Sequence, residues 1–269
     1  MKKASLKEAQ LRMLEILIEV DRICKKHHIN YWLDAGTLLG AIRHEGFIPW
    51  DDDLDIGMLR KDYNKFLQIV KNELNSNFIF QSPETDDLCQ NAFAKIRDKN
   101  SEIRSKHNNE RNLGVFIDIF PYDSFTKKNI YYKKFFNAII LSKWFGDLEF
   151  KKPFLKNILK NLIIFICKIT NSIYYFIPYE KVIKNMYKNA SKSEVTEAEK
   201  IVYGVEVPFK EAVHKSDVFP LKTYNFEGLE FPVPNNHENV LKVFYNEWEK
   251  FPPKECQIPS HTDDIYIKN

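Results

Sequence analysis

The residues with the clearest chemical meaning form an acidic run, in which positions 48–57 read Ile-Pro-Trp-Asp-Asp-Asp-Leu-Asp-Ile-Gly. Polar and apolar residues alternate at its end, which predicts a strand with Asp53 and Asp55 on one face and Leu54 and Ile56 in the core. Neighbouring carboxylates repel each other and raise each other's pKa. A divalent cation would relieve that repulsion, and oxygen ligands favour Mg²⁺ or Mn²⁺. An acidic solvated loop is the alternative, but the interleaved apolar residues argue against it.

A third carboxylate is expected from a neighbouring strand. Asp118 lies within Val-Phe-Ile-Asp-Ile-Phe-Pro at 115–121, which is otherwise apolar. A charge in such a strand needs a partner, because burying it alone is costly. The alternative is an aspartate that caps a turn before Pro121.

A small-residue turn precedes the acidic run. Gly36 and Thr37 follow a predicted strand and open a short predicted helix. Such a turn brings backbone N–H groups close to an anion. A glycine and a hydroxyl residue, a helix and then two alternating aspartates on the next strand are the order found in the nucleotidyltransferase fold.

The elements expected around these residues form an α+β domain built on a mixed sheet. Ser5 and Glu8 form a capping box at the start of a helix over 5–28, whose apolar residues recur at helical spacing. Other helices are expected at 38–43 and 61–74, and strands at 31–35, 53–57, 78–81, 92–97 and 115–120. Beyond about residue 130 the pattern becomes helical and rich in aromatics and lysine. We therefore expect a catalytic core at 1–135 and a mainly helical accessory region at 136–269.

Bulk composition excludes several classes of protein. The 269 residues are 44% hydrophobic with a net charge of only +3, so the chain can bury a core and shows no dense basic stretch for nucleic acid. The four cysteines, Cys24, Cys89, Cys167 and Cys256, form no C-x-x-C pair, which indicates reduced thiols and no zinc site. The start, MKKASLKEAQ, lacks the apolar stretch of a signal peptide, so a cytoplasmic location is expected.

Two longer stretches resemble the signature of the LicD family, which includes bacterial phosphocholine transferases and is related to fukutin and fukutin-related protein. These are Ala-Gly-Thr-Leu-Leu-Gly-Ala-Ile-Arg-His at 35–44 and Gly-Phe-Ile-Pro-Trp-Asp-Asp-Asp-Leu-Asp-Ile at 46–56. Residues 95–100 and 117–121 look like later motifs of the family, and Pro252, Pro253 and His261 like its C-terminal motif. The zinc-bearing insertion of fukutin-related protein has no counterpart in the cysteine pattern here.

The resemblance implies a nucleotidyltransferase-like core that binds a CDP-linked donor. By motif position, Asp53, Asp55 and Asp118 would be the metal ligands, with Gly36 and Thr37 beside the donor phosphates. Further donor contacts are expected from the cations of the motifs, which match phosphate oxygens, and from an aromatic residue that could contact the base or a choline head. These residues are Arg43, His44, Trp50, Lys95 and Arg97. An exposed helix end for Arg43 and His44, a solvent-facing pair for Lys95 and Arg97, and a core position for Trp50 are the alternatives.

The activity that this predicts is metal-dependent transfer of a phospho-alcohol, with phosphocholine favoured, from a CDP-linked donor to a hydroxyl of a cell-envelope glycan, releasing CMP. Asp51 or Asp52 would accept the proton of the acceptor, and the sequence does not choose between them. A nucleotidyltransferase that releases pyrophosphate, and transfer of ribitol- or glycerol-phosphate, stay open. A glycosyltransferase and a carbohydrate-binding protein without activity fit the motifs less well.

Residues 154–177 are the most hydrophobic stretch of the chain. Lys160, Asn161, Lys168 and Asn171 interrupt it, which argues against a membrane span. Apolar residues at helical spacing opposite the lysines predict an amphipathic helix, and such helices most often pack on the core. The alternative is a helix that lies in anionic headgroups and brings the enzyme to a lipid-linked acceptor.

Overall fold

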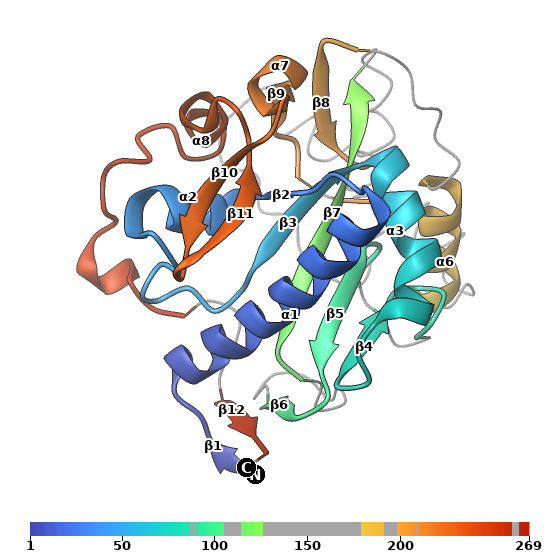
Figure 1. Ribbon diagram of the computed structural model, residues 1–269, viewed down its shortest axis with the longest axis vertical. Coiled ribbons are helices and arrows are strands. Elements are labelled where there is room, and N and C mark those ends of the chain that lie inside the picture. The colour runs from blue at the N-terminus through green and yellow to red at the C-terminus, as the bar shows by residue number, and fades with distance from the viewer. Residues whose placement is uncertain are drawn as a thin grey trace, which may run out of the picture.

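The computed structural model describes residues 1–86, 89, 91–104, 114–125, 179–190, 198–207, 209–259 and 264–268. In these ranges a mixed sheet of seven strands forms the centre, and helices α1 and α3 pack against it (Figure 1). The helices are α1 (Leu6–His27), α2 (Ala35–His44), α3 (Arg60–Glu73), α6 (Tyr179–Ala190), α7 (Lys215–Val218) and α8 (His237–Tyr245), with a 3₁₀ turn at Lys254–Cys256. The strands are β1 (Lys2–Lys3), β2 (Trp32–Leu33), β3 (Asp55–Leu59), β4 (Phe78–Gln81), β5 (Ala94–Asp98), β6 (Ser101–Arg104), β7 (Phe116–Phe125), β8 (Lys200–Tyr203), β9 (Ala212–His214), β10 (Lys222–Phe226), β11 (Leu229–Val233) and β12 (Asp264–Ile267).

The first helix begins at the predicted capping box. The Ser5 hydroxyl accepts a hydrogen bond from the Glu8 N–H, and the Glu8 carboxylate accepts one from the Ser5 N–H. The helix ends at His28, which is left-handed at φ 51° and whose N–H caps the last turn. One face of the helix is fully buried, because its apolar residues recur every three or four positions and meet the sheet.

The sheet runs β2-β3-β7-β5-β4, with β8 and β9 continuing from the far end of β7. Strands β3 and β7 are parallel, and the remaining pairs are antiparallel. This mixed sheet with helices confirms the α+β prediction. Its parallel centre places the start of β3 directly beside the start of β7.

The predicted strand over 53–57 begins two residues late, at Asp55. The sheet hydrogen bonds explain this, since the Leu54 carbonyl accepts from the Asp118 N–H at 2.8 Å and the residues before it have left the ladder. Leu54 and Ile56 are fully buried, as predicted. Asp53 therefore lies on the loop that enters the strand, and Asp55 is the first strand residue.

The C-terminal region is mixed where the structure describes it, rather than mainly helical. Strand β8 pairs with β7, Tyr203 lying opposite Tyr122, and β12 pairs with β6 and β1. The strands of this region are only three to five residues long, so their alternation of apolar and polar residues is too short to be recognised in the sequence. Strands from both sides of residue 135 thus share sheets, although the predicted boundary itself and residues 154–177 lie outside the described residues.

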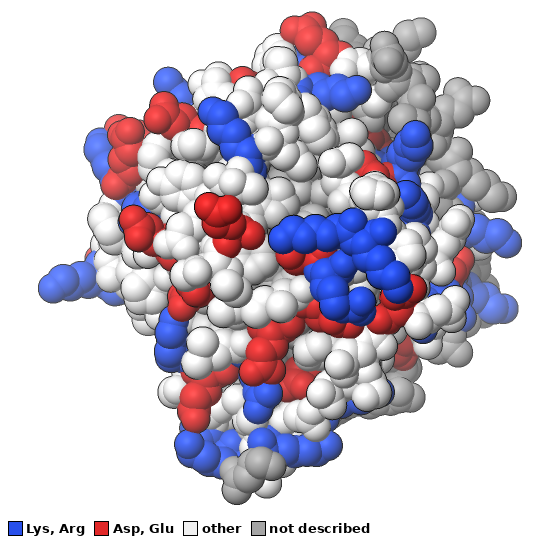
Figure 2. All heavy atoms as spheres, viewed as in Figure 1, with Lys and Arg blue, Asp and Glu red and all other residues white. Residues whose placement is uncertain are grey.

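The charged side chains on the face in Figure 2 are of both signs and lie close to one another. Along α1, Arg22 pairs with Glu19 and Lys26 with Glu73. Within the described ranges no helix is long and apolar enough to cross a bilayer. The cysteines that the structure describes, Cys24, Cys89 and Cys256, are free thiols, as predicted.

Candidate active site

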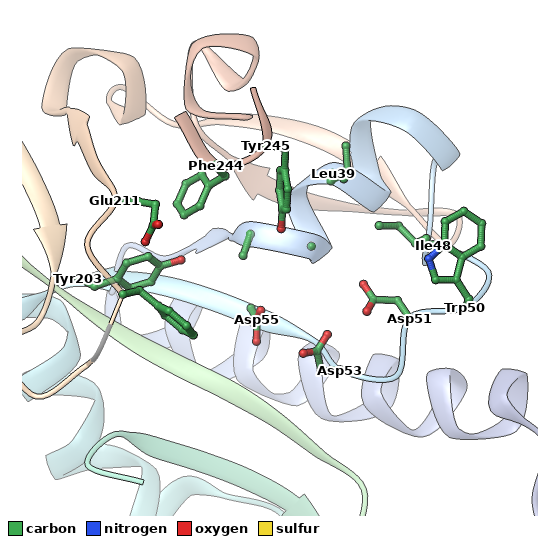
Figure 3. A pocket seen from close by; sticks show the side chains of 13 residues that line it. Leu39, Ile48, Trp50, Asp51, Asp53, Asp55, Tyr203, Glu211, Phe244 and Tyr245 are labelled. Atoms are coloured by element: carbon green, nitrogen blue, oxygen red, sulfur yellow. The ribbon is translucent and has the colours of Figure 1, made fainter. Parts of the chain in front are cut away.

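The acidic run opens into a cavity of about 420 Å³ between the start of β3, helix α2 and the C-terminal segments (Figure 3). Asp51, Asp53 and Asp55 all line it, and their carboxylates point into it. The shared face of Asp53 and Asp55 is therefore as predicted. Asp52 is fully buried and absent from the lining, so of the two candidate proton acceptors only Asp51 reaches the cavity.

Asp118 lies beside Asp55 because the two occupy paired positions of the parallel strands β3 and β7. On the other side of β7, Lys95 of β5 pairs with the same aspartate. The Lys95 ammonium donates to Asp118 Oδ1 at 2.5 Å, and both residues are more than nine-tenths buried. The sheet register thus aligns a carboxylate, a second carboxylate and a cation across three adjacent strands.

The carboxylates of the cavity are forced together in a poorly solvated place. Burial, followed by repulsion from Asp53 and Asp118, raises the pKa of Asp55 well above its usual value. Burial, followed by the charge of Asp53 and a hydrogen bond with it, raises the pKa of Asp51 to about 8. Negative charge accumulates here at a cost that a bound cation would remove.

The donor set fits a hard divalent ion, because the groups that converge are carboxylates. Among the residues that the structure describes, no group of three or more histidine, cysteine, aspartate or glutamate side chains is close enough to hold an ion as it stands. Asp118 is turned to Lys95, which neutralises it instead. Asp53, Asp55 and Asp118 could hold the metal once Asp118 turns toward the other two.

The start of α2 forms the opposite wall of the cavity. Ala35 and Gly36 line it, and Ala35 has a left-handed φ of 43°. Thr37 is buried, and its hydroxyl accepts a hydrogen bond from the Asp55 N–H at 2.8 Å. Thr37 therefore holds the position of Asp55, and its predicted contact with donor phosphates stays a prediction.

The predicted donor cations lie outside the lining of the cavity. Arg43 donates to the carbonyl of Trp248 and stacks over Phe251, with 4.6 Å from its guanidinium carbon to the ring centre. His44 packs between Trp50 and Phe251, and of this group only Trp50 lines the cavity.

On β5, Arg97 donates to Gln81 and to the Gly114 carbonyl. Lys95 and Arg97 both lie over the Phe116 ring, so they share a strand face as predicted. The buried position of Lys95 rules out a solvent-facing pair. The part of Arg43, His44, Lys95 and Arg97 in donor binding stays a prediction.

Comparison with known proteins identifies the family. A protein-family model described as LicD/FKTN/FKRP, nucleotidyltransferase domain, matches residues 28–164. The lipopolysaccharide cholinephosphotransferase LicD of Haemophilus influenzae is 32% identical over 276 residues, which cover 99% of this chain and 100% of the relative.

The chain belongs to the LicD family. It is a LicD-type phosphotransferase with a nucleotidyltransferase-like core. More distant matches are the human ribitol 5-phosphate transferase FKRP, 44% identical over 48 residues (18% of this chain, 10% of that protein), and an uncharacterised protein of Rickettsia typhi, 28% identical over 144 residues (54% and 42%).

The LicD family model ends before a group of residues that complete the cavity. The sequence offered no motif for them, because aromatic residues are abundant throughout the chain. Only the pairing of β8 with β7 and the packing of α8 against α2 bring them to the acidic run. They are Tyr203, Phe209, Glu211, Phe244 and Tyr245.

A buried aspartate behind the cavity was also missed. Asp34 is fully buried, and the Tyr122 hydroxyl donates to its carboxylate at 2.8 Å. Its N–H donates to the Asp55 carbonyl at 3.0 Å. Burial, opposed by the hydrogen bond from Tyr122, raises the pKa of Asp34 to about 6. Asp34 thus supports β3 and α2 from behind at the point where Asp55 enters the strand.

Proposed function

We propose that this LicD-type phosphotransferase moves phosphocholine from a CDP-linked donor to a hydroxyl of a cell-envelope glycan, with Mg²⁺ or Mn²⁺, and releases CMP. The observation that carries the proposal is the convergence of Asp51, Asp53 and Asp55 on one cavity, with Asp118 paired beside Asp55. The full-length similarity to a cholinephosphotransferase favours phosphocholine over other groups. The shorter similarity to a ribitol 5-phosphate transferase supports phospho-alcohol transfer as the wider class.

The metal would be held by Asp53, Asp55 and Asp118. When bound, it supplies neutralisation of the charge on the diphosphate. The lining of the cavity includes no lysine or arginine, so the carboxylates could not face a diphosphate without such a cation. Lys95, which forms an ion pair with Asp118, is a basic group that the strand register places beside this site.

Residues of the chain would handle orientation and the proton. Ala35 and Gly36, at the start of α2, line the cavity, where an anion would gain from the helix terminus. The acceptor oxygen attacks the phosphorus that carries the alcohol, and the bond from that phosphorus to the CMP oxygen breaks. The acceptor proton passes to a carboxylate oxygen of Asp51, since Asp52 is buried away from the cavity.

The acceptor is proposed to be a glycan that is lipid-linked, reached at the inner face of the cytoplasmic membrane through residues 154–177. The predicted amphipathic pattern of that segment is the support for this contact. Binding to vesicles that contain anionic lipid, weakened by salt and by changing Lys160 and Lys168 to Glu, would test it.

A nucleotidyltransferase would use the same carboxylates, so the leaving group decides between the two reactions. The protein is incubated with Mg²⁺, envelope glycans and either CDP-choline, CDP-ribitol, CDP-glycerol or CTP, and products are identified by mass spectrometry. We expect CMP and a phosphocholine-bearing glycan. Pyrophosphate, with a nucleoside monophosphate on the acceptor, would overturn phospho-alcohol transfer. A protein with both Asp53→Asn and Asp55→Asn serves as the inactive control.

A further inference from the structure

One end of the cavity is built from aromatic rings and a single carboxylate. In Figure 3, Tyr203, Phe244 and Glu211 lie at the opposite end from Trp50 and Asp51, with Asp53 and Asp55 between the two ends. Together with Phe209 and Tyr245, these residues make what we call the aromatic end. None of the five belongs to the predicted donor or metal groups.

The rings of the aromatic end form a corner rather than a flat wall. The ring centres of Tyr203 and Phe209 are 5.3 Å apart at 64°, and those of Tyr203 and Phe244 are 5.9 Å apart at 78°. Rings at such angles present faces in different directions to a group in the corner. A cation is attracted to an aromatic face when it lies within about 6 Å of the ring centre.

The charge of the cavity also favours a cation. Its lining contains four acidic residues and no lysine, arginine or histidine. The Glu211 carboxylate accepts a hydrogen bond from the Lys210 N–H at 2.9 Å, and within the described ranges no basic side chain forms an ion pair with it. A neutral polyol would instead need polar partners, and Phe209 and Phe244 offer none.

The loop that carries part of this end is firmly held. Arg60 makes a two-pronged contact with Glu206, with bonds of 2.7 and 2.8 Å, and a second with Asp123. Arg60 and Glu206 are both almost fully buried, which fixes residues 204–207 next to Tyr203. Phe209 itself is 47% exposed, so its ring is open to a ligand.

We propose that the aromatic end binds the quaternary ammonium head of the transferred alcohol, with Glu211 as its counter-charge and Phe209 and Phe244 as the ring faces, while the buried Tyr203 ring packs behind them. The phosphate would then lie toward Asp53 and Asp55. This inference rests on the proposed function and adds the residues that select choline over uncharged alcohols.

The test compares CDP-choline with its uncharged carbon analogue, CDP-3,3-dimethylbutanol, which has nearly the same shape. Isothermal titration calorimetry with Mg²⁺ gives both dissociation constants for the wild type, for Glu211→Gln and for the exposed control Glu230→Gln. We expect the wild type to prefer CDP-choline. Glu211→Gln should weaken CDP-choline roughly three- to thirtyfold, the range of a cation–π or ion contact, while the analogue changes little. Glu230→Gln should leave both constants unchanged.

Phe209→Leu, at a position that is already half exposed, gives a second variant if Glu211→Gln does not fold, and it too should weaken CDP-choline more than the analogue. Equal binding of the two ligands by the wild type, or equal weakening of both in the folded variants, would overturn the inference. Different outcomes would refute the proposed function and the head-group site. A charge preference without CMP release would refute phosphotransfer alone, whereas CMP release from CDP-glycerol without any preference for choline would refute the head-group site alone.

Discussion

Asp55 and Asp118 are register partners in the two parallel strands at the centre of the sheet. Side chains at paired positions point to the same face, so both carboxylates lie on one face of the sheet. Burial, followed by repulsion from Asp53 and then from Asp118, raises the pKa of Asp55, so the backbone ladder supplies part of that repulsion. A fold that places carboxylates at paired central positions despite this electrostatic cost has a use for concentrated negative charge, and cation binding is the simplest one.

Replacing either aspartate by asparagine keeps the shape and removes the charge. We expect Asp55→Asn and Asp118→Asn each to lower CMP release by about three orders of magnitude, since a metal supplies several kcal/mol of charge stabilisation. The melting temperature in EDTA should stay level or rise for Asp55→Asn, because repulsion is relieved. Asp264→Asn, which removes a surface partner of Lys3 far from the cavity, is the control. Wild-type turnover and Mg²⁺ affinity in Asp118→Asn would remove that residue from the metal site.

The Lys95–Asp118 pair makes a second prediction, because both partners are buried. Lys95→Met leaves the Asp118 charge without its partner, and breaking a buried pair costs about 3–5 kcal/mol. Adding Asp118→Asn should recover part of that loss. Urea unfolding of the wild type, both single variants and the double variant measures the coupling. Additive losses in the double variant would show that the two side chains do not stabilise each other.

The pH dependence follows from the raised pKa of Asp51. A carboxyl group whose folded pKa, about 8, exceeds its unfolded value holds a proton only in the folded state between the two values. Its contribution to stability is therefore present at low pH and lost as the pH rises through about 8. Burial lowers the pKa of His44 and His237. These two histidines therefore make the protein more stable as the pH rises, but this gain ends once the pH exceeds the usual pKa of histidine.

The informative window is thus pH 7 to 8.5, measured in EDTA. The free energy of unfolding should fall across it with a slope of at most about 1.4 kcal/mol per pH unit for one proton. Asp51→Asn should reduce the slope, although Asp55 with its own raised pKa keeps part of it, and Mg²⁺ should stabilise the wild type more at pH 8.5 than at pH 7. A wild-type curve as flat as that of Asp51→Asn would contradict the raised pKa.

The aspartates of the cavity could be predicted from the sequence, whereas the residues of the aromatic end could not. Asp53, Asp55 and Asp118 could be recognised because they are carboxylates within otherwise apolar segments. Asp53 and Asp55 are two positions apart, which in a strand places them on the same face. Helix α1 could also be predicted, because its N-terminal capping box and its row of apolar residues are local features of the sequence. Local patterns of this kind need no knowledge of the rest of the fold.

The remaining features depend on contacts that are distant in sequence. Tyr203 and Phe244 reach the cavity only through strand pairing and helix packing, which no spacing reveals. The same reason explains Arg43, whose cation was expected near phosphate but donates to the carbonyls of Trp248 and Lys250 some 205 and 207 positions away. The partners of these residues in the fold could not be predicted from side-chain type alone.

Two glycines of α2 allow activity and folding to be separated. A Cβ at Gly36 would lie 2.9 Å from Asp51 Oδ2, whereas one at Gly40 would lie 2.5 Å from the Gly46 carbonyl oxygen. A carboxylate at the end of a side chain can rotate away, but the backbone of a tight loop cannot. We expect Gly36→Ala to fold with a melting temperature close to that of the wild type and to lose activity roughly ten- to a hundredfold, the scale of a misplaced catalytic group.

Gly40→Ala should instead lower the free energy of unfolding by about 1–3 kcal/mol, the usual cost of overpacking, and its activity loss should follow from the smaller folded fraction. Thermal unfolding and CMP release, measured on the same preparations, separate the two effects. Full activity in Gly36→Ala would show that Asp51 need not occupy its present position, and would pass the role of proton acceptor to another group of the cavity.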